Sequence, residues 1–164
     1  MTSVRTTTPE GTDRTWHGTI RLAHPGDLSG LVRLEQTCFA IPWTEQSLRS
    51  DLANPALAHY FVAVTPSDEI VGYIACYQAA DTAQITNLAV LPSFRRHGIG
   101  EKLLSALLAW ALDNQIAVVD LEVRTSNEQA IRLYRKMGFV QVGIRRGYYA
   151  DNNEDANIML KNIL

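Results

Sequence analysis

The sequence predicts a single α/β domain built on a mixed β-sheet, and three observations carry this prediction. The length of 164 residues is that of one compact domain. Within residues 60–77, two strand-like segments are joined by the turn residues Pro66-Ser-Asp-Glu, which favours an antiparallel hairpin. Residues 83–123 have the strand, helix and strand pattern of a parallel βαβ unit. Antiparallel and parallel pairs in one sheet make that sheet mixed.

Three elements are expected ahead of the hairpin. The alternation of residues 19–22 predicts a strand, and Asp27 precedes apolar residues at helical spacing. Pro42 breaks this helix, and Thr44 is placed to cap a second helix that runs through Leu52.

The βαβ unit follows the hairpin. Residues 83–91 and 116–123 are its expected strands, and a broad apolar helical face follows Gly98 and Gly100. A face of that width suits a helix that lies on a sheet.

A short helix and a closing hairpin are expected at the end of the chain. Ser126 and Gln129 match a capping box, which marks the start of the helix, and Gly138 marks its end. Residues 139–144 and 156–160 have strand character and flank a polar stretch, so they are expected to pair.

The composition excludes several classes of protein. The chain is 46% hydrophobic and 20% charged, as soluble globular proteins are. Its 15 Lys and Arg against 17 Asp and Glu leave a formal charge of −2, which argues against direct nucleic-acid binding. The longest apolar run, residues 106–112, is far shorter than the roughly 20 residues of a membrane-spanning helix.

Cysteine usage and the N-terminus favour a cytoplasmic protein. Cys38 and Cys76 lie among apolar residues and match no metal or redox motif, so we expect reduced thiols and no metal site. Residues 1–17 show no apolar period and no secretion signal, and are expected to form a flexible tail. The domain is therefore expected to span residues 18–164.

A phosphate-binding turn is indicated at the start of the long apolar helix. Arg95, Arg96 and His97 lead into two glycines at a helix N-terminus, where unpaired N–H groups and the helix dipole favour an anion. The spacing differs from a Rossmann fingerprint, because Leu103 stands at the third glycine, and from a P-loop, because Gly100 is followed by Glu. The alternative is a glycine-rich turn with solvated arginines.

Two further residues have the chemistry of a catalytic site. Glu122 lies near the carboxyl end of the second parallel strand, where open α/β sheets place ligands, and is a candidate general base. The alternative is a carboxylate paired with Arg124 or Lys102. Tyr134 is either a proton donor or a core aromatic at helical spacing.

Taken together, these segments resemble the GNAT acetyltransferases. The resemblance is carried by Arg95-x-x-Gly98-x-Gly100 and by the segments around Glu122 and Tyr134, Leu-Glu-Val-Arg-Thr-Ser-Asn and Ala-Ile-Arg-Leu-Tyr-Arg-Lys-Met-Gly-Phe. It extends to the RimI-type N-terminal acetyltransferases and covers residues 18–162, through Phe39-x-x-Pro-Trp-Thr, Asn87-Leu-Ala-Val and Arg145-Arg-Gly-Tyr-Tyr-Ala-Asp-Asn-Asn-Glu-Asp-Ala. It implies the GNAT acyl-CoA N-acyltransferase fold, a central twisted mixed sheet of about seven strands flanked by about four helices.

The resemblance also implies an activity and a set of site residues. The family transfers acetyl from acetyl-CoA to the N-terminal amine of a protein, usually the terminal alanine of the eighteenth protein of the small ribosomal subunit. Glu122 would accept the amine proton, directly or through a water, and Tyr134 would protonate the departing thiolate. The Val90 N–H would hold the thioester oxygen. The residues expected at the cofactor are Leu88, Ala89, Val90, Arg95, Arg96, His97, Gly98, Ile99, Gly100, Glu101 and Asn127. Asn127 is equally suited to start the helix that follows it, and the two roles are compatible.

The acceptor peptide is expected to lie beside the last hairpin. Its expected neighbours are Trp43, Tyr148, Tyr149 and Asp151, with Glu154 and Asp155 able to meet a basic peptide. The alternative is a solvated hairpin tip with structural tyrosines. Two other functions stay open, a GNAT enzyme that acetylates lysine, other N-termini or a small amine, and an acyl-CoA-binding module without turnover.

Overall fold

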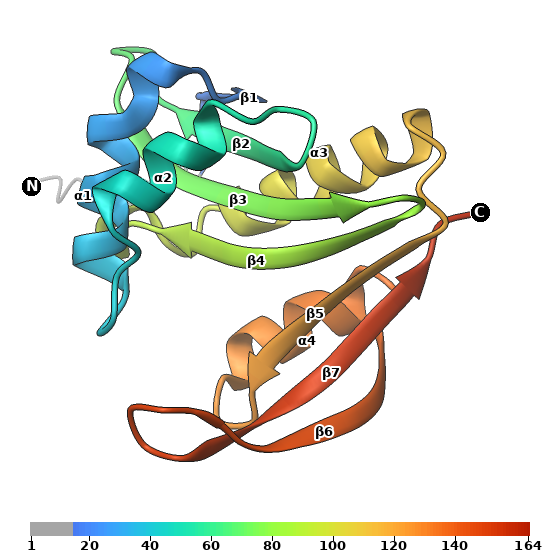
Figure 1. Cartoon of the computed structure of the whole chain (residues 1–164). Helices are drawn as coiled ribbons and strands as arrows, with labels where there is room; N and C mark the ends of the chain where they lie inside the picture. The colour runs from blue at the N-terminus through green and yellow to red at the C-terminus, as the bar shows by residue number, and fades with distance from the viewer. Residues whose placement is uncertain (1–14) are drawn as a thin grey trace, which may run out of the picture.

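Seven strands form one mixed sheet, as the sequence predicts. The structure, a computed structural model, describes residues 15–164. The strand order is β1-β2-β3-β4-β5-β7-β6, and every neighbouring pair is antiparallel except β4 and β5 (Figure 1). The strands are β1 Thr19–Leu22, β2 Ala58–Val64, β3 Ile70–Ala79, β4 Thr82–Val90, β5 Val118–Arg124, β6 Val140–Tyr149 and β7 Glu154–Asn162.

Four α-helices cover the two faces of the sheet. They are α1 Leu28–Cys38, α2 Glu45–Leu52, α3 Ile99–Asp113 and α4 Glu128–Lys136. Short 3-10 turns lie at Pro25–Asp27 and Pro92–Phe94. Helices α1 and α2 pack on one face of strands β2 to β4, and α3 packs on the opposite face (Figure 1). No helix within residues 15–164 is long and apolar enough to cross a membrane.

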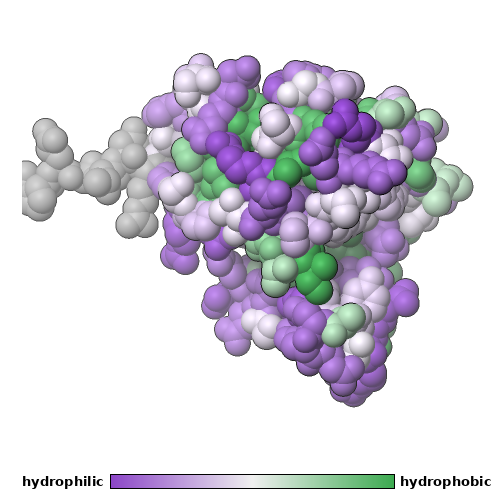
Figure 2. Space-filling view, turned by 60° about the vertical axis from the view of Figure 1, so that its left-hand side comes forward, coloured by the Kyte–Doolittle hydropathy of each residue, from purple (hydrophilic) through white to green (hydrophobic). Residues whose placement is uncertain are grey.

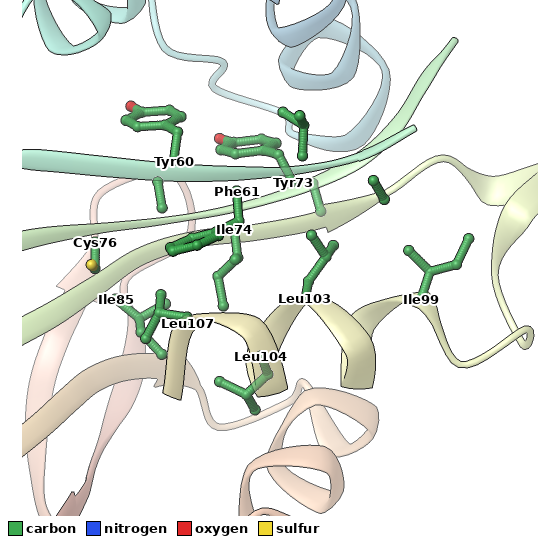
Figure 3. Packing of buried hydrophobic residues seen from close by; sticks show 14 of the residues in the cluster. Tyr60, Phe61, Tyr73, Ile74, Cys76, Ile85, Ile99, Leu103, Leu104 and Leu107 are labelled. Atoms are coloured by element: carbon green, nitrogen blue, oxygen red, sulfur yellow. The ribbon is translucent and has the colours of Figure 1, made fainter. Parts of the chain in front are cut away.

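The alternation of side chains along the central strands fills both layers of the core. Tyr60 and Tyr73 point from β2 and β3 toward α1 and α2, whereas Ile74 points toward α3 (Figure 3). On α3, Leu103 and Leu107 meet that face and are fully buried. Each such side chain contributes roughly 1.5–3 kcal/mol to stability through burial. The core therefore fixes α1, α2 and α3 against β2 and β3.

The parallel strands β4 and β5 separate halfway along their length. Their pairing runs from Thr82 opposite Val118 to Ile85 opposite Leu121, after which the strands diverge (Figure 1). The separation begins at a bulge, because the register between β3 and β4 skips Thr86. A bulge bends the strand that carries it, and the bend opens a gap between β4 and β5.

Two local features differ from the sequence-based expectation. Trp16, placed in the tail by sequence, is 9% exposed and packs in the core, whereas residues 1–14 of the expected tail lie outside the described residues. The capping box predicted from Ser126 does not form. Asn127 caps α4 instead, with its Oδ1 accepting from the Ala130 N–H at 3.2 Å. The reason is that the Ser126 N–H donates to Glu154 Oε2 at 2.8 Å, which holds Ser126 outside the helix.

Candidate active site

The gap between β4 and β5 joins two cavities. The larger cavity, about 610 Å³, is enclosed by the α1–α2 loop, the diverging strands, α4 and the turn between β6 and β7. The smaller cavity, about 390 Å³, lies between the loop after β4, the start of α3 and α4. Five residues line both cavities: Cys38, Phe39, Leu88, Asn127 and Ala130. The two cavities therefore adjoin at the gap, and together they form the passage between β4 and β5.

The surface over this passage is visibly hollowed. Figure 2 shows the hollow between the part of the molecule built from β1–β4 with α1 and α2 and the part built from β6 and β7. Hydrophobic atoms gather in it, while the surrounding surface is mostly hydrophilic. A concave, partly apolar site with a few polar groups is the usual form of a small-molecule site.

The smaller cavity has the chemistry of an anion site. Gly98 is the N-cap of α3 and has φ +76°, a left-handed conformation that favours glycine. A Cβ at this position would meet no atom within 4 Å, so the space beside the backbone is open. The first N–H groups of the 15-residue α3 have no partner inside the helix, and Arg95 and Arg96 add positive charge.

The structure brings together ten of the eleven residues expected at the cofactor. The residues that line the smaller cavity include Leu88, Ala89, Val90, Arg95, Arg96, Gly98, Ile99, Gly100, Glu101 and Asn127. His97 is not among the lining residues of either cavity. Its Nδ1 lies 3.1 Å from the Phe94 carbonyl oxygen and 2.9 Å from that of Arg95, so His97 braces the turn instead.

The Val90 N–H lies on the open edge of β4. The Leu91 N–H donates to the Val71 carbonyl of β3 at 2.8 Å. Successive backbone groups alternate between the two edges of an antiparallel strand, so the Val90 N–H is directed away from β3 and into the gap. The Val90 carbonyl shares this edge and accepts from Arg95 Nε at 2.9 Å.

Glu122 lies in the wall of the larger cavity with its carboxylate fixed at both oxygens. Its side chain is 12% exposed, and Oε1 lies 3.1 Å from Arg145 Nε. Oε2 accepts from Gln84 Nε2 at 3.0 Å. The partners suggested by sequence are engaged elsewhere: Arg124 pairs with Asp151 at 2.9 Å, and the Lys102 ammonium lies over the Trp16 ring.

Tyr134 is buried yet reaches the larger cavity. Its ring packs edge-on against Phe139, with 5.6 Å between centroids, and its residue is 6% exposed. Burial, together with the nearby Tyr149, raises the pKa of Tyr134 above its usual value. The hydroxyl therefore stays protonated at neutral pH.

Three of the four residues expected at the acceptor line the larger cavity, namely Trp43, Tyr149 and Asp151. Tyr148 does not. It is 47% exposed and packs edge-on against Tyr149, with 5.1 Å between ring centroids. Burial raises the pKa of Tyr149 to about 12 although the Arg124 guanidinium lies 3.9 Å from its ring centre.

The acidic side chains near the last hairpin are already paired inside the chain. Arg124 binds Asp151 and Glu154, at 2.9 Å and 3.3 Å, and Arg146 binds Asp155 at 2.8 Å. Their charges are compensated, so these carboxylates offer a basic peptide less than the sequence suggests. Within residues 15–164, no group of three or more His, Cys, Asp or Glu side chains is placed to hold a metal ion.

With this geometry in view, comparison with known proteins decides the family. Residues 28–139 match the family model described as Acetyltransferase (GNAT) family. The chain belongs to the GNAT acetyltransferases. It is 34% identical over 143 residues to the ribosomal protein bS18-alanine N-acetyltransferase of Salmonella typhimurium, covering 86% of this chain and 95% of that protein.

Two solved structures share the fold of this GNAT acetyltransferase. The ribosomal-protein-S18-alanine N-acetyltransferase from Escherichia coli matches with a TM-score of 0.82 and 33% identity, over 89% of this chain and 94% of that one. Arabidopsis thaliana NAA60 in complex with acetyl-CoA matches with a TM-score of 0.80 and 21% identity, over 89% and 98% of the two chains. The second match shows the fold alone.

Four polar residues at the site of this GNAT acetyltransferase were not predicted from the sequence as site residues. Gln84 and Arg145 hold Glu122, and the buried Glu35 accepts from the partly buried Asn87, which lines the larger cavity. The available signal was a polar residue at a position that periodicity assigns to a buried face, as for Glu35 on α1. That signal indicates that partners exist but does not name them.

Proposed function

We propose that this GNAT acetyltransferase transfers the acetyl group of acetyl-CoA to the N-terminal α-amine of a protein, and that the acceptor is the N-terminal alanine of ribosomal protein bS18. The observation that carries the proposal is the passage between β4 and β5, which joins an anion site to a second cavity containing Glu122 and Tyr134. The activity that the Salmonella relative's name states supports the choice of acceptor.

The smaller cavity suits the diphosphate of acetyl-CoA. Arg95, Arg96 and the N–H groups at the start of α3 would hold it, because a helix N-terminus and guanidinium groups both favour phosphate. The open space beside Gly98 lets a bulky anion approach the backbone. When bound, acetyl-CoA supplies an acyl group activated as a thioester.

Glu122 supplies the base that an α-amine needs. With a pKa of roughly 7.7–8.0, an N-terminal amine is mostly protonated at pH 7 and must lose a proton before it can attack. Gln84 and Arg145 hold the carboxylate at the cavity wall in one orientation. A base that is held in place lowers the entropic cost of bringing the base and the amine together.

Tyr134 and the Val90 N–H would act on the leaving group and on the carbonyl oxygen of the thioester. Tyr134 is protonated at neutral pH and lines the larger cavity, where it would donate its proton to a departing thiolate. The Val90 N–H, on the open edge of β4, is placed to donate to developing negative charge on a carbonyl oxygen. Each residue thus has one role that its surroundings favour.

The proposal is tested with a peptide that carries both kinds of amine. A peptide of the N-terminal residues of bS18, with a free terminal alanine and at least one lysine, is incubated with acetyl-CoA and sequenced by tandem mass spectrometry. We expect acetyl on the α-amine only, and none on a matched peptide whose terminus is already acetylated. Acetyl confined to lysine, or cofactor binding with transfer to no peptide, would overturn the proposal.

A further inference from the structure

A buried carboxylate is hydrogen-bonded to two residues that line the larger cavity, Trp43 and Asn87. Glu35 of α1 is fully buried and accepts three hydrogen bonds. Oε2 accepts from the Trp43 N–H at 2.7 Å, and Oε1 accepts from Asn87 Nδ2 at 2.7 Å and from the Tyr73 hydroxyl. A buried charge needs such partners. The carboxylate therefore ties the α1–α2 loop, β3 and β4 together beside the cavity.

The hydrogen bonds fix which way the Asn87 amide faces. A carboxylate only accepts, so the amide atom turned toward Glu35 must be the nitrogen. Burial, and then the charge of Glu35, raise the pKa of Tyr73. Its hydroxyl therefore stays protonated and donates a hydrogen bond to Glu35. The Tyr73 oxygen in turn accepts from Asn87 Nδ2 at 2.8 Å. Both contacts are made by the nitrogen on one side of the amide, which holds that nitrogen at Glu35 and Tyr73.

One polar atom of Asn87 is left. No donor among residues 15–164 reaches its Oδ1, and Asn87 is one of the residues that line the larger cavity. Because the nitrogen is held at Glu35, Oδ1 is the polar atom of Asn87 left to a ligand in the cavity, and a carbonyl oxygen accepts hydrogen bonds. The side chain is selective for a ligand that brings an N–H or O–H to β4.

An α-amine is such a ligand. It arrives protonated, with three N–H donors, and loses its hydration on entering the cavity. Across the gap, both oxygens of Glu122 already have partners in Gln84 and Arg145. Asn87 Oδ1, on the β4 side of the gap, is a second acceptor for a hydrogen bond from the amine.

We propose that Asn87 Oδ1 accepts a hydrogen bond from the acceptor α-amine, and that Glu35 and Tyr73 are positioning residues that keep this oxygen turned to the cavity. This inference rests on the proposed function, because it takes the acceptor to be an α-amine. It assigns Asn87 to acceptor binding, separate from the residues expected at the cofactor.

The test compares two peptides that differ only in the amine. One begins with alanine and the other with propionyl in its place, which removes the α-amine and keeps the carbon skeleton. Binding of both is measured by calorimetry on the full chain saturated with CoA, which carries no acetyl group to transfer. For wild type we expect tighter binding of the alanyl peptide, because hydrogen bonds to a charged donor are among the stronger ones.

Asn87→Ala should remove much of that preference. We expect the ratio of the two dissociation constants to fall roughly tenfold or more, while the propionyl peptide binds within about twofold of wild type. An equal loss for both peptides would show a purely structural role, and an unchanged ratio would show no contact; either overturns the inference. Asn114→Ala, at the exposed end of α3, is the matched control and should leave the ratio unchanged.

Tyr73→Phe keeps the inference testable if Asn87→Ala does not fold. It removes one of the two groups that hold the Asn87 nitrogen and leaves the bond to Glu35. We expect a smaller loss of the alanyl preference, about twofold to fivefold, with unchanged CoA affinity; no loss would contradict the positioning role. Transfer to lysine in the mass-spectrometric assay would contradict the proposed function itself. Transfer to the α-amine, with an unchanged ratio of the two dissociation constants in Asn87→Ala, would contradict this inference alone.

Discussion

Replacement of Glu122 by glutamine removes the proposed base with little change in shape. Glutamine has nearly the same volume, and its carbonyl oxygen can still accept from Gln84. Arg145 loses its ionic partner, but its side chain is 56% exposed, so we expect stability to change by less than about 1 kcal/mol. The variant therefore isolates proton transfer from folding.

The size and pH dependence of the effect follow from the amine. General bases contribute about 10²- to 10⁴-fold, so at pH 7 we expect kcat/KM of Glu122→Gln to fall roughly hundredfold or more. With an amine pKa of about 7.8, roughly one molecule in seven is unprotonated at pH 7 and nearly all at pH 9. The variant should therefore regain about sevenfold between these pH values.

The assay is initial-rate kinetics of CoA release with the alanyl peptide, from pH 6 to pH 9. The matched control is Asp120→Asn, the same chemical change two residues earlier on the same face of β5. We expect the control to stay within about twofold of wild type. An unchanged rate for Glu122→Gln at pH 7, or an equal loss in the control, would refute the assignment of Glu122.

Three further results are expected. Tyr134→Phe should lower kcat by tenfold or more and leave the CoA dissociation constant within about twofold; a calorimetric loss of CoA binding would recast Tyr134 as a cofactor contact. Gly98→Ala puts a side chain on a residue with φ +76° and should lower the free energy of unfolding in urea by about 1–2 kcal/mol. An unchanged urea midpoint would show that alanine is not strained there. Hydrogen bonds from the side chain and backbone of Ser126 lower the pKa of Glu154 to about 2. Glu154→Gln should thus be less stable than wild type above about pH 4.5, with the difference lost as pH falls toward 2, and a pH-independent difference would argue against this.

Local patterns predicted most of the elements because those elements depend on near neighbours. Thr44 was placed at the start of α2, and the Ser47 N–H indeed donates to its Oγ1 at 3.1 Å. The same holds for the βαβ unit, where apolar period and glycines mark β4, α3 and β5 in sequence. The capping box predicted from Ser126 at α4 was wrong because Glu154, far along the chain, holds Ser126 outside the helix.

The partners of the site residues depend on strand order, which local pattern does not encode. Sequence proximity suggested Arg124 for Glu122, but β5 lies between β4 and β7, and Glu122 meets Gln84 and Arg145 from other strands. Asn87 and Glu35 are 52 positions apart and meet only because α1 packs over β3 and β4. A polar residue on a buried face was visible in the sequence, whereas its partner required the fold.

The most direct test of the passage between β4 and β5 is a crystal structure with CoA covalently joined to the N-terminal amine of an acceptor peptide. We predict the diphosphate at the start of α3 and the peptide in the larger cavity. The joining atoms should lie in the gap, beside the Val90 N–H and Glu122. A peptide bound along the outer edge of the sheet, or joining atoms remote from both groups, would contradict the account.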